Sequence, residues 1–138
     1  MSNIKDLIEK YDKSGMFDSI LNFPSQINTA FSIMEGWNTD KKYTNIKNIL
    51  ILGMGGSAIG GDACRVLVQD ECKIPIYVNR SYNIPNWVDK DTLIIASSYS
   101  GNTEETLSAF NQCLELNASI IAMSTGGKLI DIVLNHNL

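Results

Sequence analysis

The sequence predicts an α/β domain in which a parallel sheet carries helices on both faces. Two observations lead to this fold class. First, four short segments are almost continuously apolar and rich in β-forming residues, which is typical of strands buried on both faces of a parallel sheet. Second, segments with helical periodicity alternate with them, and such alternation requires right-handed crossover connections. The expected strands are 48–52, 74–78, 92–96 and 119–123.

Three helices are expected between and after these strands. The helix at 58–69 has four apolar residues on one side: Ile59, Ala63, Val66 and Leu67. The helix at 103–116 repeats apolar residues at i, i+3 and i+7: Leu107, Phe110 and Leu114. Spacings of this kind predict amphipathic helices. A last helix is expected at 127–135, whereas the segment 79–91, with Pro85 and several asparagines, is predicted to be a loop.

The chain is predicted to consist of a helical N-terminal extension, residues 1–45, followed by the α/β domain, residues 46–138. Residues 3–10 form a short amphipathic segment. Residues 17–36 place apolar side chains at helical spacing, with an interruption near Pro24, since proline disfavours a continuous helix at this point. The sequence shows no internal repeat and no low-complexity segment.

Composition and charge exclude several classes of partner. The 138 residues have a net charge of −4 and are 44% hydrophobic, as is typical of a soluble globular domain. The basic residues do not cluster, so no nucleic-acid partner is expected. The N-terminus lacks the apolar core of a signal peptide, and the longest apolar run, 49–52, is too short to cross a bilayer. We therefore expect a cytoplasmic protein without a membrane partner.

The cysteines indicate neither disulfides nor a metal site. Cys64, Cys72 and Cys113 are odd in number and show no CxxC spacing, which argues against both a disulfide framework and zinc. We interpret them as small core or helix residues. Neither a metal nor a cofactor is expected.

Two loops are candidates for binding a ligand. Residues 53–57 leave the first expected strand, residues 97–103 leave the third, and both run directly into helices. In an open parallel sheet, ligands bind outside the carboxyl ends of the strands, where the strand order reverses. Each loop offers backbone N–H groups backed by a helix N-terminus, which is an arrangement suited to an anion.

The first loop permits three interpretations, of which a Walker A loop fails because no Gly-Lys-Ser/Thr follows the glycines. A dinucleotide fingerprint fits at Gly53-x-Gly55-x-x-Ala58, but the ribose-binding acid is missing after the second expected strand. Arg80 at that position could instead face a 2′-phosphate, which keeps an NADP-dependent oxidoreductase as an alternative. The third interpretation is a terminal phosphate of a small molecule, to which Ser57 would add a hydroxyl.

The second loop favours the phosphate interpretation. It carries three hydroxyls, Ser98, Ser100 and Thr103, within six residues. The structural alternative is that Asn102 or Thr103 only caps the following helix, with Glu105 completing a capping box. Three hydroxyls exceed what a cap requires. Hydroxyls and amides without Lys or Arg suit a phosphate monoester that is held by neutral donors.

The stretches "GMGGSAIGGD" (53–62) and "SYSGNTEETL" (98–107) together resemble the sugar isomerase (SIS) domain, with the bifunctional phosphoglucose/phosphomannose isomerase family as the nearest match. The resemblance covers about residues 45–138 and implies a doubly wound, flavodoxin-like sheet of the SIS type. It also implies the residues of a phosphate site: Gly56, Ser57, Ser98, Ser100 and Thr103. The implied reaction interconverts glucose 6-phosphate or mannose 6-phosphate with fructose 6-phosphate, in a cytoplasmic homodimer without a cofactor.

The same resemblance implies that the catalytic residues lie beyond Leu138, in segments that supply a glutamate base and a ring-opening histidine. Within the chain, His136 is expected on the surface, Glu104 and Glu105 support a helix N-terminus, and Asp62 is structural. The segment 124–128, "STGGK", leaves the fourth expected strand at the same edge and could contact the sugar or form only a turn. The alternative function is a non-catalytic sugar-phosphate-binding module, such as a sensor.

Overall fold

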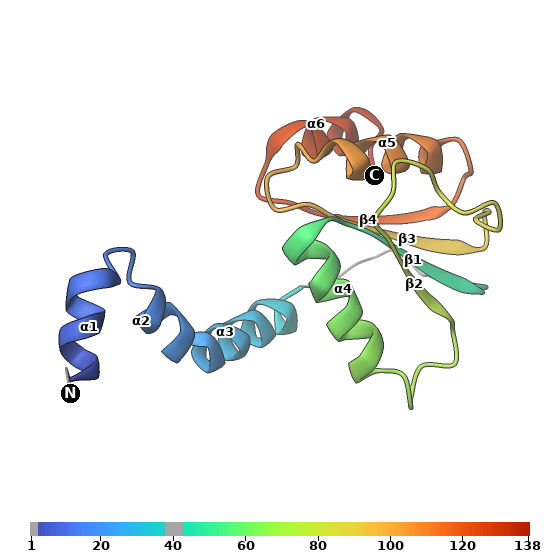
Figure 1. Ribbon diagram of the computed structural model, residues 1–138. Helices are drawn as coiled ribbons and strands as arrows, with labels where there is room; N and C mark the ends of the chain where they lie inside the picture. The colour runs from blue at the N-terminus through green and yellow to red at the C-terminus, as the bar shows by residue number, and fades with distance from the viewer. Residues whose placement is uncertain (1–2, 38–42) are drawn as a thin grey trace. The chain divides into compact units, whose positions relative to one another are not determined.

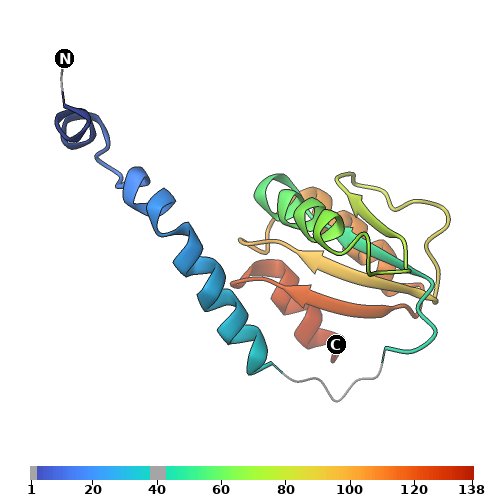
Figure 2. The ribbon, with the colours of Figure 1, turned by 90° about the horizontal axis from the view of Figure 1, so that it is seen from below.

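The computed structural model describes residues 3–37 and 43–138. The chain divides into two compact units, Met1–Lys42 and Tyr43–Leu138. The first unit consists of helices and the second contains the sheet, as Figures 1 and 2 show.

The first unit contains the helices α1 (Ile4–Tyr11), α2 (Met16–Leu21) and α3 (Phe23–Glu35). Asp12 caps α2, because its carboxylate accepts hydrogen bonds from Met16 N at 2.8 Å and Phe17 N at 2.7 Å. These backbone donors hold the pKa of Asp12 below its usual value. The break expected near Pro24 is observed, and the proline stands in the first turn of α3, where its missing N–H costs no hydrogen bond.

The second unit is an α/β domain with a parallel four-stranded sheet in the order β2-β1-β3-β4. The strands are β1 (Asn48–Leu52), β2 (Ile76–Asn79), β3 (Thr92–Ser97) and β4 (Ser119–Met123). The helices are α4 (Gly55–Leu67), α5 (Glu104–Leu114) and α6 (Gly127–Asn135). In Figure 1, α4 covers one face of the sheet, whereas α5 and α6 cover the other. The predicted doubly wound α/β fold is therefore confirmed.

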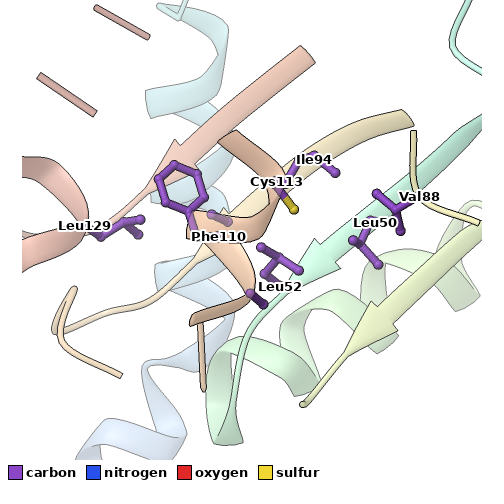
Figure 3. Close-up of a cluster of buried hydrophobic side chains, with 9 residues drawn as sticks. Leu50, Leu52, Val88, Ile94, Phe110, Cys113 and Leu129 are labelled. Atoms are coloured by element: carbon purple, nitrogen blue, oxygen red, sulfur yellow. The ribbon is translucent and has the colours of Figure 1, made fainter. Parts of the chain in front are cut away.

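The main core lies between the sheet and the α5–α6 layer. Phe110 of α5 and Leu129 of α6 are fully buried against Leu50, Leu52 and Ile94 of the two central strands, as Figure 3 shows. Burial of a side chain of this size stabilises a fold by about 1.5–3 kcal/mol. The apolar spacing seen in the sequence therefore correctly identified the face of α5 that meets the sheet.

The apolar side of α4, in contrast, faces away from the sheet. Ile59 is 66% exposed and Leu67 is 82% exposed, whereas the buried residues of α4 are Ala58 and Gly61. A Cβ at position 61 would lie 3.0 Å from Cγ2 of Ile51, so α4 approaches the sheet through small residues. Periodicity alone could not show this, because it locates an apolar stripe without identifying what the stripe contacts.

The second strand begins later than expected, at Ile76 instead of residue 74. Pro75 has no N–H to donate, but its carbonyl accepts a hydrogen bond from Ile49 N of β1 at 2.9 Å, just before β2 begins to pair with β1. The strand ends at Asn79, which is buried and donates its side-chain amide to the carbonyls of Ser81 and Asn83. The following loop is thereby held close to the end of the strand.

Candidate functional site

Both candidate loops meet at the point where the strand order reverses. The strands β1 and β3 are neighbours, and from there the chain proceeds to β2 on one side and β4 on the other. Leu52 pairs with Ala96, so the carboxyl ends of the two strands lie together. A Cβ at Gly53 would lie 3.2 Å from the Ser97 carbonyl oxygen, which shows how closely the loops approach each other. This is the position where open α/β sheets bind ligands.

The first loop is shorter than expected, because α4 already begins at Gly55. The predicted residues Gly56 and Ser57 therefore stand in the first turn of the helix. Ser57 N already donates to Met54 O at 3.1 Å, whereas the N–H of Gly56 lacks an intrahelical acceptor. The preceding residue, Met54, provides no side-chain cap. Gly55 has a φ of +52°, a conformation that favours glycine, and nothing would lie within 4 Å of a Cβ at Gly56. The start of α4 is thus open to an approaching anion.

The second loop presents its three hydroxyls in different ways. Ser98 is 3% exposed, and its Oγ lies 3.1 Å from Oγ1 of the half-buried Thr103. Ser100 is exposed, and its Oγ accepts a hydrogen bond from the backbone amide of Asn102 at 3.2 Å. Each hydroxyl has a single hydrogen, so the Ser98–Thr103 pair keeps one for a ligand while Ser100 keeps its own.

Thr103 does not cap α5 with its side chain, although it occupies the N-cap position. Its hydroxyl is directed to Ser98 instead, and the side chain of Asn102 bonds to Lys128 N at the start of α6. The alternative in which one of these residues merely caps α5 is therefore not what the structure shows. The first amide of α5 to bond back along the chain is Leu107 N, which donates to Thr103 O at 3.0 Å.

The segment 124–128 braces the second loop. Thr125 donates both its amide and its hydroxyl to the Tyr99 carbonyl, at 3.2 and 2.7 Å, and Leu129 N donates to Gly101 O at 3.0 Å. Gly101 has a φ of +67°, and a Cβ there would clash with the carbonyl oxygen of Gly126. The segment is therefore more than a turn, and its contact with a sugar stays a prediction.

The charged residues singled out from the sequence lie around the loops. Arg80 forms an ion pair with Asp62 of α4, and its Nη2 lies 3.5 Å from Ala58 O, so the group that an NADP phosphate would need is already engaged. Glu104 is exposed, with its Oε2 3.5 Å from the Tyr82 hydroxyl. Glu105 and Glu104 raise the pKa of Tyr82 above its usual value, because their charges disfavour a phenolate.

Other features of the described residues bear on alternative functions. His136 is exposed at the C-terminal end of α6, as expected. Across residues 3–37 and 43–138, no three His, Cys, Asp or Glu side chains gather into a group that could hold a metal ion. Over the same ranges, every helix is too short or too polar to cross a membrane.

Comparisons with known proteins agree on one family. The pattern of the SIS domain matches residues 42–128. The chain is 54% identical to the bifunctional phosphoglucose/phosphomannose isomerase of Caldicellulosiruptor bescii over 83% of its length, and 45% identical to that of Thermoplasma acidophilum over 62%. It spans only 34% and 26% of these two proteins.

A solved structure supports the fold. A candidate phosphosugar isomerase from Clostridium difficile superposes with a TM-score of 0.68 and 23% identity, over 84% of this chain and 34% of that protein. At this identity the likeness concerns the arrangement of strands and helices. It matches the doubly wound sheet on which the two loops are placed.

Proposed function

We propose that this chain, which belongs to the SIS domain family, supplies the phosphate-binding domain of a sugar-phosphate isomerase. The reaction is the interconversion of glucose 6-phosphate or mannose 6-phosphate with fructose 6-phosphate. The identity of 54% to a bifunctional phosphoglucose/phosphomannose isomerase supports this substrate class. Because the chain spans about a third of that relative, the activity is proposed for the whole protein.

The phosphate lies between the two loops and is held by neutral donors. We assign it the first turn of α4, with Gly56 and Ser57, and the second loop, with the hydroxyls of Ser98, Ser100 and Thr103. Hydrogen bonds to a charged partner contribute about 1.5–3 kcal/mol each, and a helix N-terminus adds about 0.3–2 kcal/mol. Several such contacts together offset the cost of removing the phosphate from water.

This site holds one end of the substrate while the chemistry takes place at the other. Isomerisation transfers a proton between C2 and C1 through an enediol, whereas the phosphate is attached at C6. A site of this kind needs a base within hydrogen-bond reach of C1 and C2, together with a group that opens the ring. No residue of this chain is assigned either role, and the phosphate contacts serve to position the reacting carbons.

The observation that carries the proposal is the meeting of two uncapped helix starts and three hydroxyls at the strand-order reversal. Isothermal titration calorimetry of the purified chain tests it, with fructose 6-phosphate as ligand and fructose as the matched control without phosphate. Binding of fructose 6-phosphate in the micromolar to millimolar range is expected, with no heat from fructose. Equal affinity for both sugars would refute a phosphate site.

A non-catalytic sugar-phosphate-binding module is the second candidate, because the chain carries binding groups and no assigned base. Conversion of fructose 6-phosphate, coupled to glucose-6-phosphate dehydrogenase, separates the two candidates when the chain is compared with a full-length relative. The chain alone is expected to bind without turnover. Turnover that Glu104→Gln or Glu105→Gln abolishes would place the base on α5.

We also propose that the whole protein is a homodimer and that it works in the cytoplasm. The exposed apolar side chains of α4, among them Ile59 and Leu67, support self-association because they offer a surface that a second copy could cover. Light scattering coupled to size-exclusion chromatography tests the dimer. A monomer at all accessible concentrations would contradict it.

A further inference from the structure

The side chain of Asn102 connects the second loop to the start of α6. Its Nδ2 donates to the Ser100 carbonyl at 3.1 Å, and its Oδ1 accepts from Lys128 N at 3.2 Å. Its backbone amide donates to the Ser100 hydroxyl oxygen at 3.2 Å. Asn102 thus bonds to both the backbone and the side chain of Ser100, and Lys128 of α6 holds Asn102 in place.

The backbone at the start of α6 is shaped for this contact. Gly127 has a φ of +72°, and a Cβ there would clash with the Ser100 carbonyl oxygen and lie 2.8 Å from Asn102 Nδ2. Only a residue without a side chain lets the helix start come this close. The contact between Asn102 and Lys128 N therefore joins segments 26 residues apart in the sequence.

We propose that Asn102 is a positioning residue that orients the Ser100 hydroxyl toward a bound phosphate. A hydroxyl offers one hydrogen and two lone pairs, and the backbone N–H of Asn102 occupies one lone pair of Ser100 Oγ. The side chain of Asn102 holds this N–H in place through its bonds to Ser100 O and Lys128 N. The hydrogen must therefore point away from that amide, and Ser100 is exposed at the open end of the loop. Asn102 orders the donor before the ligand arrives, which reduces the entropy lost on binding.

This inference rests on the proposed function, since it assigns Asn102 to the same phosphate site. A double-mutant cycle tests it, with inorganic phosphate as the probe in calorimetry of the full 138-residue chain. Asn102→Ala keeps the backbone N–H but removes the two side-chain bonds that hold it in place, so it is expected to weaken phosphate binding about tenfold in the wild-type background. In the Ser100→Ala background the same substitution is expected to weaken binding less than twofold, because the hydroxyl that Asn102 orients is already absent.

Two further variants separate positioning from folding. Asn111→Ala is the matched control, since Asn111 is an exposed asparagine on α5, and it is expected to bind phosphate as the wild type does. Asn102→Asp keeps the acceptor for Lys128 N but loses the donor to Ser100 O and adds a negative charge. It is expected to retain the wild-type circular dichroism spectrum and to bind at least tenfold more weakly.

The failure of each proposal is recognisable. If the wild-type chain does not bind phosphate, the proposed function fails and this inference fails with it, before any substitution is made. If the wild type binds but Asn102→Ala binds equally well, the inference alone is wrong. Equal losses in the two backgrounds would also overturn it, because they would show a general effect on the loop that does not act through Ser100.

Discussion

Ser98 Oγ lies 3.1 Å from Thr103 Oγ1, and this contact joins the end of β3 to the start of α5. Ser98 is buried and its amide donates to the Met123 carbonyl of β4 at 3.1 Å, so this side of the pair is fixed to the sheet. Thr103 is half-buried at the end nearer the solvent. The pair therefore presents a hydroxyl at the helix start from a rigid support.

Removal of two hydroxyls tests the phosphate assignment directly. The double variant Ser100→Ala, Thr103→Val is expected to weaken binding of glucose 6-phosphate tenfold or more. A tenfold change corresponds to about 1.4 kcal/mol, which is slightly less than the about 1.5–3 kcal/mol that a single charge-assisted hydrogen bond contributes. Calorimetry measures the effect, and Ser108→Ala, a change of the same kind further along α5, is the control. Unchanged affinity of the double variant would refute the assignment.

Substitution of two glycines by alanine is expected to have opposite effects on stability. Gly101→Ala requires a side chain at a φ of +67° and a clash with Gly126 O, so it should destabilise the fold and weaken phosphate binding. Gly60→Ala meets open space within α4 and should stabilise the fold by about 0.5–1 kcal/mol. Urea unfolding followed by circular dichroism measures both. A neutral Gly101→Ala would show that the second loop and the segment 124–128 are not packed tightly together.

Stability is expected to depend on pH through Asp91. Its side chain is 16% exposed and lies 2.6 Å from Lys47 Nζ and 2.7 Å from Lys90 Nζ. These two lysines lower the pKa of Asp91 to about 2 from its usual 3.8. Because the folded-state pKa is the lower one, this stabilisation is complete above about pH 4 and is lost as the pH falls toward 2.

The variant Asp91→Asn isolates this effect from other carboxyl groups. At pH 7 its melting temperature is expected to lie below that of the wild type, and the difference should shrink between pH 4 and pH 2. Thermal unfolding of both proteins at several pH values measures the difference. A difference that stays constant down to pH 2 would show that the ion pairs with Lys47 and Lys90 are not its source.

The hydroxyl of Thr106 is expected to cost stability. It is buried in α5, where the residue is 2% exposed, and within the described chain it has no hydrogen-bond partner. Thr106→Val keeps the branched shape and removes the unsatisfied group, so it should raise the free energy of unfolding by about 1 kcal/mol. Urea unfolding measures this change. A lower stability for the variant would show that the hydroxyl is bonded in solution.

Local sequence patterns were sufficient to predict the strands and the position of the two loops. Four apolar runs indicated the parallel sheet, and the loops that follow the first and third runs lie at the strand-order reversal. This succeeded because a strand buried on both faces must be apolar along its length, and because parallel connections bring carboxyl ends to one edge. The hydroxyls of the second loop were also recognisable from the sequence, because all three stand within six consecutive residues.

The face of α4 and the contact of Asn102 with α6 were decided only by the tertiary structure. The apolar stripe containing Ile59 is exposed because α4 packs against β1 and β2 through the small residues Ala58 and Gly61, and a local pattern does not show which side of a helix makes such a contact. Asn102 contacts α6 instead of capping its own helix, because folding brings Lys128 N within 3.2 Å of its side chain. The sequence by itself determined which residue types could bind an anion and where the chain would present them. Only the folded structure decided that Ser98 is buried and paired with Thr103 while Ser100 stays exposed, because the bend of the loop and its packing against β4 and α6 set these distances.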